Sequence, residues 1–144
     1  MIRKILLVIA ALVGLVLIGF GLIQLVPYGR NHTNPPVTAE PAWDSPQTRA
    51  LAVRACFDCH SNETTWPWYS NVAPMSWLIQ RDVDEGRRRL NFSEWNRPQR
   101  ERGRLGRIVA EGEMPPWYYV IIHPTANLSS AETQQLANGL NATQ

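Results

Sequence analysis

The sequence has only two cysteines, Cys56 and Cys59, in 144 residues. Two thiols cannot build the disulfide framework of a small secreted scaffold, and they supply only half of a four-cysteine zinc site. An excess of one charge is also missing, because 12 basic and 12 acidic residues follow Val26. A neutral balance of this kind argues against a nucleic-acid-binding protein.

Convincing strand pairs, internal repeats and low-complexity tracts are lacking as well, which predicts an all-α fold. Residues 118–122 are the one stretch that the pattern allows as a short extended run. Gly112 to Leu128 is otherwise expected to be a long loop. Helices are expected after a cap at Asp44 or Ser45, at residues 76–89, at residues 96–111, and after the Ser129/Glu132 capping box.

One long hydrophobic run is present, from Ile5 to Val26, and it holds no charged residue. As a helix it would span about 33 Å, enough to cross a bilayer. Arg3 and Lys4 precede it and place the N-terminus inside by the positive-inside rule. A cleaved signal peptide is the alternative, but its apolar region is normally about 7–15 residues long and ends at small residues. We therefore predict an uncleaved N-terminal transmembrane anchor over residues 1–26.

The chain after the apolar run divides by composition. Residues 27–43 contain four prolines and form a predicted Pro-rich linker. Residues 44–144 are predicted to be one globular domain, beginning with a helix that has Pro46 in its first turn. The predicted organisation is therefore an anchor, a linker and a domain.

The domain contains the sequence Cys56-Phe57-Asp58-Cys59-His60. Cys-x-x-Cys-His is the attachment signature of a c-type haem. Positions three apart share one face of a helix, so both sulfurs can reach the vinyl groups of one porphyrin. His60 would then be the proximal iron ligand. The sequence predicts one covalent haem c, held by thioethers from Cys56 and Cys59.

Three other interpretations of the motif exist. A thioredoxin-like Cys-x-x-Cys requires a βαβ pattern, which is missing. A zinc site would need a fourth ligand from His32, His123 or a carboxylate. A pair of buried structural cysteines is the third alternative.

The sixth iron ligand is predicted to be Met114. Met114 lies on a loop between Gly112, which lets the backbone bend, and Pro115, which stiffens it. His123 is the alternative ligand and would give a bis-histidine haem. Met75 opens an apolar helix, so core packing is its expected role.

Two further groups of residues accompany the motif. Four arginines share one face of the helix expected at 96–111, and they suggest a solvated face, a contact to haem propionates, or a dock for an acidic partner or lipid: Arg97, Arg100, Arg104 and Arg107. Large aromatic side chains suit a small domain that encloses a macrocycle. The six tryptophans are therefore expected in the haem crevice and the core: Trp43, Trp66, Trp68, Trp77, Trp95 and Trp117.

The chain resembles the bacterial haem-binding domain family, which is c-type cytochrome-like. The resemblance begins at the Cys-x-x-Cys-His motif and covers roughly residues 41–140. It continues through Thr65-Trp66-Pro67-Trp68-Tyr69-Ser70, Ala73-Pro74-Met75-Ser76-Trp77-Leu78, Gly86-Arg87, Asn91-Phe92-Ser93-Glu94-Trp95, Gly112-Glu113-Met114-Pro115-Pro116 and His123-Pro124. It implies haem bound through Cys56, Cys59 and His60 in a small helical domain. It does not supply a reaction or a partner.

Taken together, these features predict a membrane-anchored mono-haem cytochrome in a bacterial inner membrane, with its C-terminal domain in the periplasm. We expect an electron carrier that exchanges single electrons with a redox protein, and not an enzyme. Residues 5–26 would contact the bilayer, and the oligomeric state is not predicted. A haem sensor or small catalyst with an open sixth position is one alternative. An accessory subunit of a larger membrane complex is the other.

Overall fold

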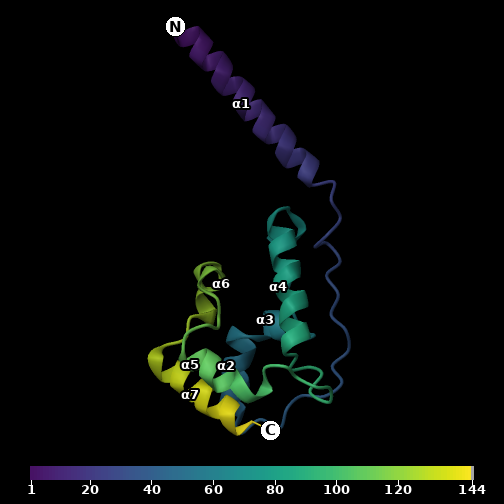
Figure 1. Cartoon of the computed structure of the whole chain (residues 1–144), viewed down its shortest axis with the longest axis vertical. Helices are drawn as coiled ribbons and strands as arrows, with labels where there is room; N and C mark the ends of the chain where they lie inside the picture. The colour runs from purple at the N-terminus through teal and green to yellow at the C-terminus, as the bar shows by residue number, and fades with distance from the viewer. Residues whose placement is uncertain (144) are drawn as a thin grey trace. The chain divides into compact units, whose positions relative to one another are not determined.

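The structure, a computed structural model, describes residues 1–143, and the regular elements of these residues are all helices (Figure 1). No β-strand occurs among them; a single parallel bridge pairs Ala39 with Glu94. The all-α prediction is therefore confirmed. The elements are α1 (Ile2–Ile23), α2 (Pro46–Ala55), α3 (Phe57–His60), η1 (Trp68–Asn71), α4 (Met75–Arg89), η2 (Arg102–Arg104), α5 (Leu105–Ala110), α6 (Trp117–Ile122), η3 (Pro124–Ala126) and α7 (Ser130–Ala142).

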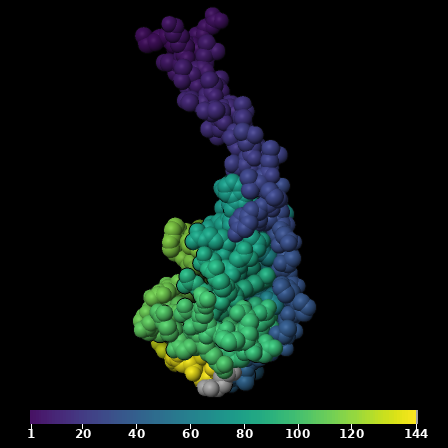
Figure 2. Space-filling model, turned by 45° about the vertical axis from the view of Figure 1, so that its right-hand side comes forward, coloured from purple at the N-terminus to yellow at the C-terminus, as the bar shows by residue number. Residues whose placement is uncertain are grey.

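The N-terminal helix α1 is apolar along its whole length. It has 22 residues and buries none of them, so its side chains cover the surface of the purple segment in Figure 2. Within residues 1–143 it is the one helix long and apolar enough to cross a membrane. An N-terminal helix that could serve as a single-pass anchor is thus present where the sequence predicts it.

The chain forms two compact units. The first unit holds residues 1–32 together with residues 67–81. The second unit holds residues 33–66 and the chain from Asp82 onward. Helix α4 contributes its first seven residues to the first unit and the rest to the second. The cysteine motif belongs to the second unit.

The core of the second unit lies where α2, α5 and α7 meet. Ser45 caps α2 by accepting a hydrogen bond from the Thr48 amide, and Ser129 and Glu132 form the predicted capping box of α7. The helices pack closely because Gly106 lies against the α7 backbone, where a Cβ atom would be 2.4 Å from the Ala137 oxygen. The buried cluster contains Leu51, Ala52, Phe57, Leu90, Phe92, Trp95, Leu105, Val109, Leu136, Ala137 and Leu140.

Two predicted elements are wrong. The helix expected at residues 96–111 is reduced to η2 and α5, because the Arg97 side chain bonds Glu94 and the Arg100 amide donates to the Arg89 carbonyl instead of to a helical partner. The run at residues 118–122 is the helix α6 and not extended. Pro116 caps it, and the Pro116 carbonyl accepts hydrogen bonds from the amides of Tyr119 and Val120.

Much of the predicted linker packs against the second unit. We call residues 33–43 the strap. The Thr38 amide donates to the Ser93 carbonyl at 2.9 Å, and the Trp95 amide donates to the Ala39 carbonyl at 2.9 Å. The Trp43 ring lies 5.1 Å from the ring of Phe92. The strap is therefore part of the folded unit and not a free spacer.

Candidate functional site

The cysteine motif lies at a break between two helices. Helix α2 ends at Ala55, and Cys56 has non-helical dihedral angles before α3 begins. The Cys56 carbonyl accepts hydrogen bonds from the amides of Cys59 and His60, at 3.2 and 2.9 Å. These bonds close a single tight turn around the motif. Burial raises the pKa of both Cys56 and Cys59 to about 12, so both side chains are neutral thiols at neutral pH.

His60 is held in one tautomer. Its Nδ1 lies 3.2 Å from the carbonyl oxygen of Leu90. A carbonyl only accepts, so the proton is on Nδ1 and Nε2 carries a free lone pair. Burial is the main cause that lowers the pKa of His60, which keeps the ring neutral. A neutral imidazole oriented by a backbone carbonyl is the form in which histidine binds iron.

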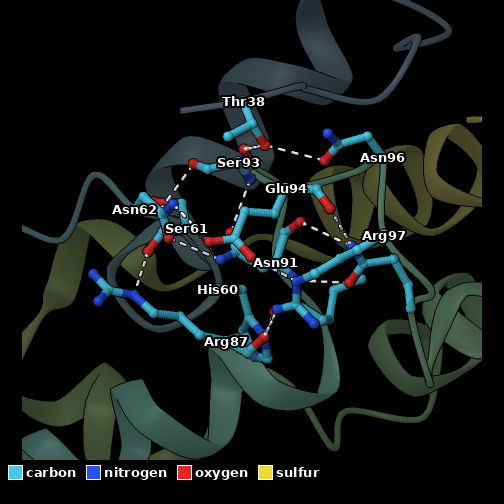
Figure 3. A network of polar contacts seen from close by, with 12 residues as sticks. Thr38, His60, Ser61, Asn62, Arg87, Asn91, Ser93, Glu94, Asn96 and Arg97 are labelled. Atoms are coloured by element: carbon cyan, nitrogen blue, oxygen red, sulfur yellow. Dashed lines mark hydrogen bonds and ion pairs between the residues drawn. The ribbon is translucent and has the colours of Figure 1, made fainter. Parts of the chain in front are cut away.

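A polar network fixes the turn that carries the Leu90 carbonyl (Figure 3). The Asn91 side chain donates to the Asn62 oxygen at 2.8 Å and accepts from the Ser93 amide at 2.9 Å. The Ser93 hydroxyl accepts from the Asn62 amide at 2.9 Å. The two asparagines and the serine are almost completely buried. The turn after α4 is thus rigidly tied to the segment that follows the motif.

The same network reaches the motif from two further directions. The Phe92 amide donates to the His60 carbonyl at 2.8 Å. Arg87 on α4 donates to the Ser61 carbonyl at 2.8 Å (Figure 3). The Ser61 hydroxyl donates to the Phe57 carbonyl at 2.8 Å. The backbone on both sides of His60 is therefore fixed by hydrogen bonds as well as by helix packing.

A cavity of about 220 Å³ opens beside the motif. It brings together Cys56, His60 and Met114, three of the four residues predicted to bind haem. Cys59 is not in its lining; it packs against Gly86 of α4, where a Cβ atom would lie 2.3 Å from the Cys59 oxygen. The other lining residues are Arg89, Leu90, Phe92, Glu101, Arg104, Leu105, Ile108, Val109, Glu113 and Leu140.

The alternative ligands lie elsewhere. The His123 ring stacks on Tyr119 at 4.1 Å, its Nδ1 is bonded to the Tyr119 carbonyl, and it does not line the cavity. His32 is bonded to the carbonyls of Gly29 and Ser70. Within residues 1–143, no three His, Cys, Asp or Glu side chains gather as a metal site would require.

The structure corrects the expectation for the aromatic residues. None of the six tryptophans is among the residues described as lining the cavity. Trp95 is buried and Trp43 packs on the core, whereas Trp68 and Trp117 are 79% and 75% exposed. The expectation is therefore confirmed for Trp43 and Trp95, which belong to the core, and is wrong for Trp68 and Trp117.

The arginine stripe is also absent, since its residues do not share one helix. Arg97 pairs with Glu94, Arg104 with Glu101 at 3.5 Å, and Arg107 with Glu111 at 3.9 Å. Arg104 lines the cavity, as does Arg89 of α4. Arg89 lies outside the expected stripe. A contact between Arg104 and acidic groups of a ligand is thus the part of the expectation that the geometry supports.

Two tyrosines fasten helix α6, one to the motif and one to α4. Tyr119 donates to the carboxylate of Asp58 at 2.6 Å, inside the Cys-x-x-Cys-His sequence. Tyr118 donates to Asp82 of α4 at 3.0 Å. These pairs, and the roles of Asn62, Asn91 and Ser93, are not apparent from the sequence pattern. For Asn91 and Ser93 the available signal is the Asn91-Phe92-Ser93-Glu94-Trp95 stretch, where polar residues stand among large aromatic ones.

A small helical domain with a cavity that presents a thiol, a neutral imidazole and a thioether has the donor set of a haem protein. The model of a family described as a haem-binding domain matches residues 18–142, and the chain belongs to this family. No curated protein and no solved structure matches the chain. The donor set and the family agree on a haem cofactor.

Proposed function

We propose that this protein is a membrane-anchored c-type cytochrome that carries single electrons with one covalent haem. The observation that carries the proposal is the meeting of Cys56, His60 and Met114 at one cavity, with His60 Nε2 free to bind a metal. In this proposal Cys56 and Cys59 form the two thioethers, His60 is the proximal ligand, and Met114 is the distal ligand. Haem bound in this way would supply a one-electron iron couple.

The residues of the chain position the candidate iron ligand His60 and form the surroundings of the cavity. The Leu90 carbonyl orients His60 and increases the basicity of its ring. Apolar side chains such as Leu105, Val109 and Leu140 line the cavity and give an apolar macrocycle a surface to pack against. Arg89 and Arg104 are the cationic side chains of the lining and are suited to bind propionates. Low dielectric and a thioether ligand both favour the reduced form of haem iron.

Covalent attachment is tested by extracting the denatured protein with acidified organic solvent and measuring the mass of the chain. The proposal expects the haem to stay with the chain. Replacing both cysteines, in Cys56→Ala/Cys59→Ala, should release it. A wild-type chain with the mass of the bare polypeptide would refute covalent binding.

Whether the protein is an electron carrier or a haem sensor or catalyst depends on whether a side chain occupies the sixth coordination position of the iron. Met114 is 37% exposed and lies on a loop, so an open-position haem sensor or small catalyst is the second candidate. A carrier with both axial positions filled should bind carbon monoxide slowly and turn over peroxide poorly. Rapid binding together with enzymatic peroxide turnover would favour the second candidate.

The proposed location follows from α1. Arg3 and Lys4 would hold the N-terminus in the cytoplasm, and the second unit would then lie in the periplasm, where it meets a redox protein partner. N-terminal sequencing of protein extracted from membranes tests the anchor. A mature chain that starts at or after Pro27 would refute it.

A further inference from the structure

The end of α1 is bonded to a segment far along the chain. Gln24, the one strongly polar residue of the apolar run, donates from Nε2 to the Ala73 carbonyl at 2.9 Å and accepts from the Ala73 amide at 2.9 Å. Arg30 donates to the Gln24 carbonyl at 2.5 Å and so caps the end of the helix. This two-bond clasp, which we call the Gln24 clasp, ties residue 73 to the exit of α1.

Two more contacts reinforce the clasp. Gly29 has φ +81°, and a Cβ atom there would lie 2.2 Å from the Ser76 carbonyl oxygen, so the chain after α1 runs directly against the start of α4. The Nε2 of His32 lies 3.1 Å from the carbonyl oxygens of both Gly29 and Ser70. Residues 67–81 and the end of α1 therefore form one compact unit.

This unit presents large apolar side chains to solvent. Trp68 of η1 is 79% exposed and lies edge-on to Tyr69, with ring centroids 5.7 Å apart. Leu25 and Tyr28 after α1 and Leu78 of α4 are exposed too. Tryptophan and tyrosine beside the end of a membrane-spanning helix are typical of the headgroup region, where an amphipathic ring is stable.

We infer that η1 is a second membrane-contact element, with Trp68 inserted among the lipid headgroups beside the exit of α1. This inference rests on the proposed anchoring by α1. Continuity with α1 favours lipid as the occupant. The Gln24 clasp and the bond from His32 to Ser70 hold η1 close to the point where the apolar run ends, and the headgroup layer is roughly 5–8 Å deep there. The clasp also satisfies the polar side chain of Gln24 at the edge of the bilayer.

The test uses the full-length protein in phosphatidylethanolamine/phosphatidylglycerol nanodiscs that contain a phospholipid with a photoactivatable group near its headgroup. Crosslinked peptides are mapped by mass spectrometry. The expected result is lipid crosslinking of both α1 and the peptide that contains Trp68. Crosslinking of α1 without the Trp68 peptide would overturn the inference and leave the anchor intact, whereas crosslinking of neither would overturn both.

Trp117 serves as the matched control, because its exposed fraction, 75%, is close to the 79% of Trp68 but it belongs to the second unit. Equal lipid labelling of the Trp117 peptide would show that labelling follows exposure alone and would overturn the inference. Gln24→Leu removes both bonds of the clasp and keeps the side chain's size. It should reduce crosslinking of the Trp68 peptide at least threefold while α1 stays labelled. Unchanged crosslinking would overturn the role of the clasp.

Discussion

The His60 side and the Met114 side of the cavity are built differently. The His60 ring bonds the Leu90 carbonyl, and buried polar side chains such as Asn62 and Asn91 fix the surrounding backbone. Met114 lies on a loop, and more than a third of its side chain is exposed. One side of the site is therefore organised before any ligand arrives, and the other is left adaptable.

This difference suggests a division of roles. A side that is rigid in advance does not have to be ordered when the cofactor binds, which lowers the entropic cost of binding. An adaptable side can close on the cofactor afterwards, because methionine is flexible and its sulfur is polarizable. Variants on the two sides should therefore affect different properties. The four below are ordered by the size of the effect expected on stability.

The largest effect is expected for Asn91→Ala, which removes the centre of the network on the His60 side. It leaves the buried oxygen of Asn62 and the buried amide of Ser93 without partners. We expect a loss of about 2–4 kcal/mol in the free energy of unfolding. Urea unfolding of the purified protein measures it. Asn138→Ala, at an exposed position of α7, should change stability by less than about 0.5 kcal/mol; equal losses would contradict the proposed role of the network.

Gly86→Ala should disturb the contact between α4 and the motif. The new methyl group would lie 2.3 Å from the Cys59 oxygen, so one of the two helices must shift. We expect a loss of about 1–3 kcal/mol. Gly103→Ala is the control, because a Cβ atom there meets nothing within 4 Å. If both variants unfold at the wild-type urea concentration, the close approach of α3 to α4 is not important for stability.

Glu94→Gln tests the charged edge of the network. The hydrogen bond from Asn62, together with Arg97, lowers the pKa of Glu94 below 4.5. The stabilisation is therefore present above about pH 4.5 and is lost as the pH falls through the lowered pKa. We expect the variant to lose about 1 kcal/mol at pH 7. The difference in the free energy of unfolding between the wild type and the variant should decrease below pH 4.5. A difference that does not change with pH would show that ionisation of Glu94 is not its cause.

The smallest effect on stability is expected for Met114→Ala, below about 1 kcal/mol, because the side chain is partly in solvent already. Its effect should appear in the spectrum instead. The weak sulfur-to-iron band of the oxidised haem should vanish while the haem stays covalently bound, and Met75→Ala should preserve the band. A stability loss above 2 kcal/mol with an unchanged band would make Met114 a packing residue.

The sequence predicted those helix starts that depend on contacts between residues close in the chain. The caps at Ser45 and Ser129 act within one helical turn, and both helices begin where they were predicted. The helix expected at 96–111 failed for a non-local reason, since Arg97 bonds the Arg87 carbonyl and Arg100 bonds the Arg89 carbonyl. Helical periodicity alone does not reveal such competing partners.

The candidate ligand residues of the site could be predicted from the sequence, but the residues that hold them in position could not. Spacing pointed to Cys56 and His60, and a stiff loop pointed to Met114; all three meet at the cavity, while their role as haem ligands stays a prediction. The acceptor for His60 is the backbone carbonyl of Leu90. Every residue has a carbonyl, so no residue type marks that position. Asn62 and Asn91 can be read in the sequence, but only the fold shows that their side chains are hydrogen-bonded to each other.

The strap has a consequence for the order in which the chain can fold. Its contacts join residues far apart in sequence, since Thr38 bonds a residue 55 positions later. In the N-to-C export that the proposed periplasmic location requires, the strap and the motif emerge first, and the turn at Ser93 and Trp95 emerges well after them. The contact between Thr38 and Ser93 closes a long loop, so it cannot form until the later segment is available. Until then Trp43 cannot pack on Phe92, and Cys56 and Cys59 lie in an open chain. In the proposed function, the strap would thus leave a period during export in which haem could be attached to both sulfurs before the core closes around them.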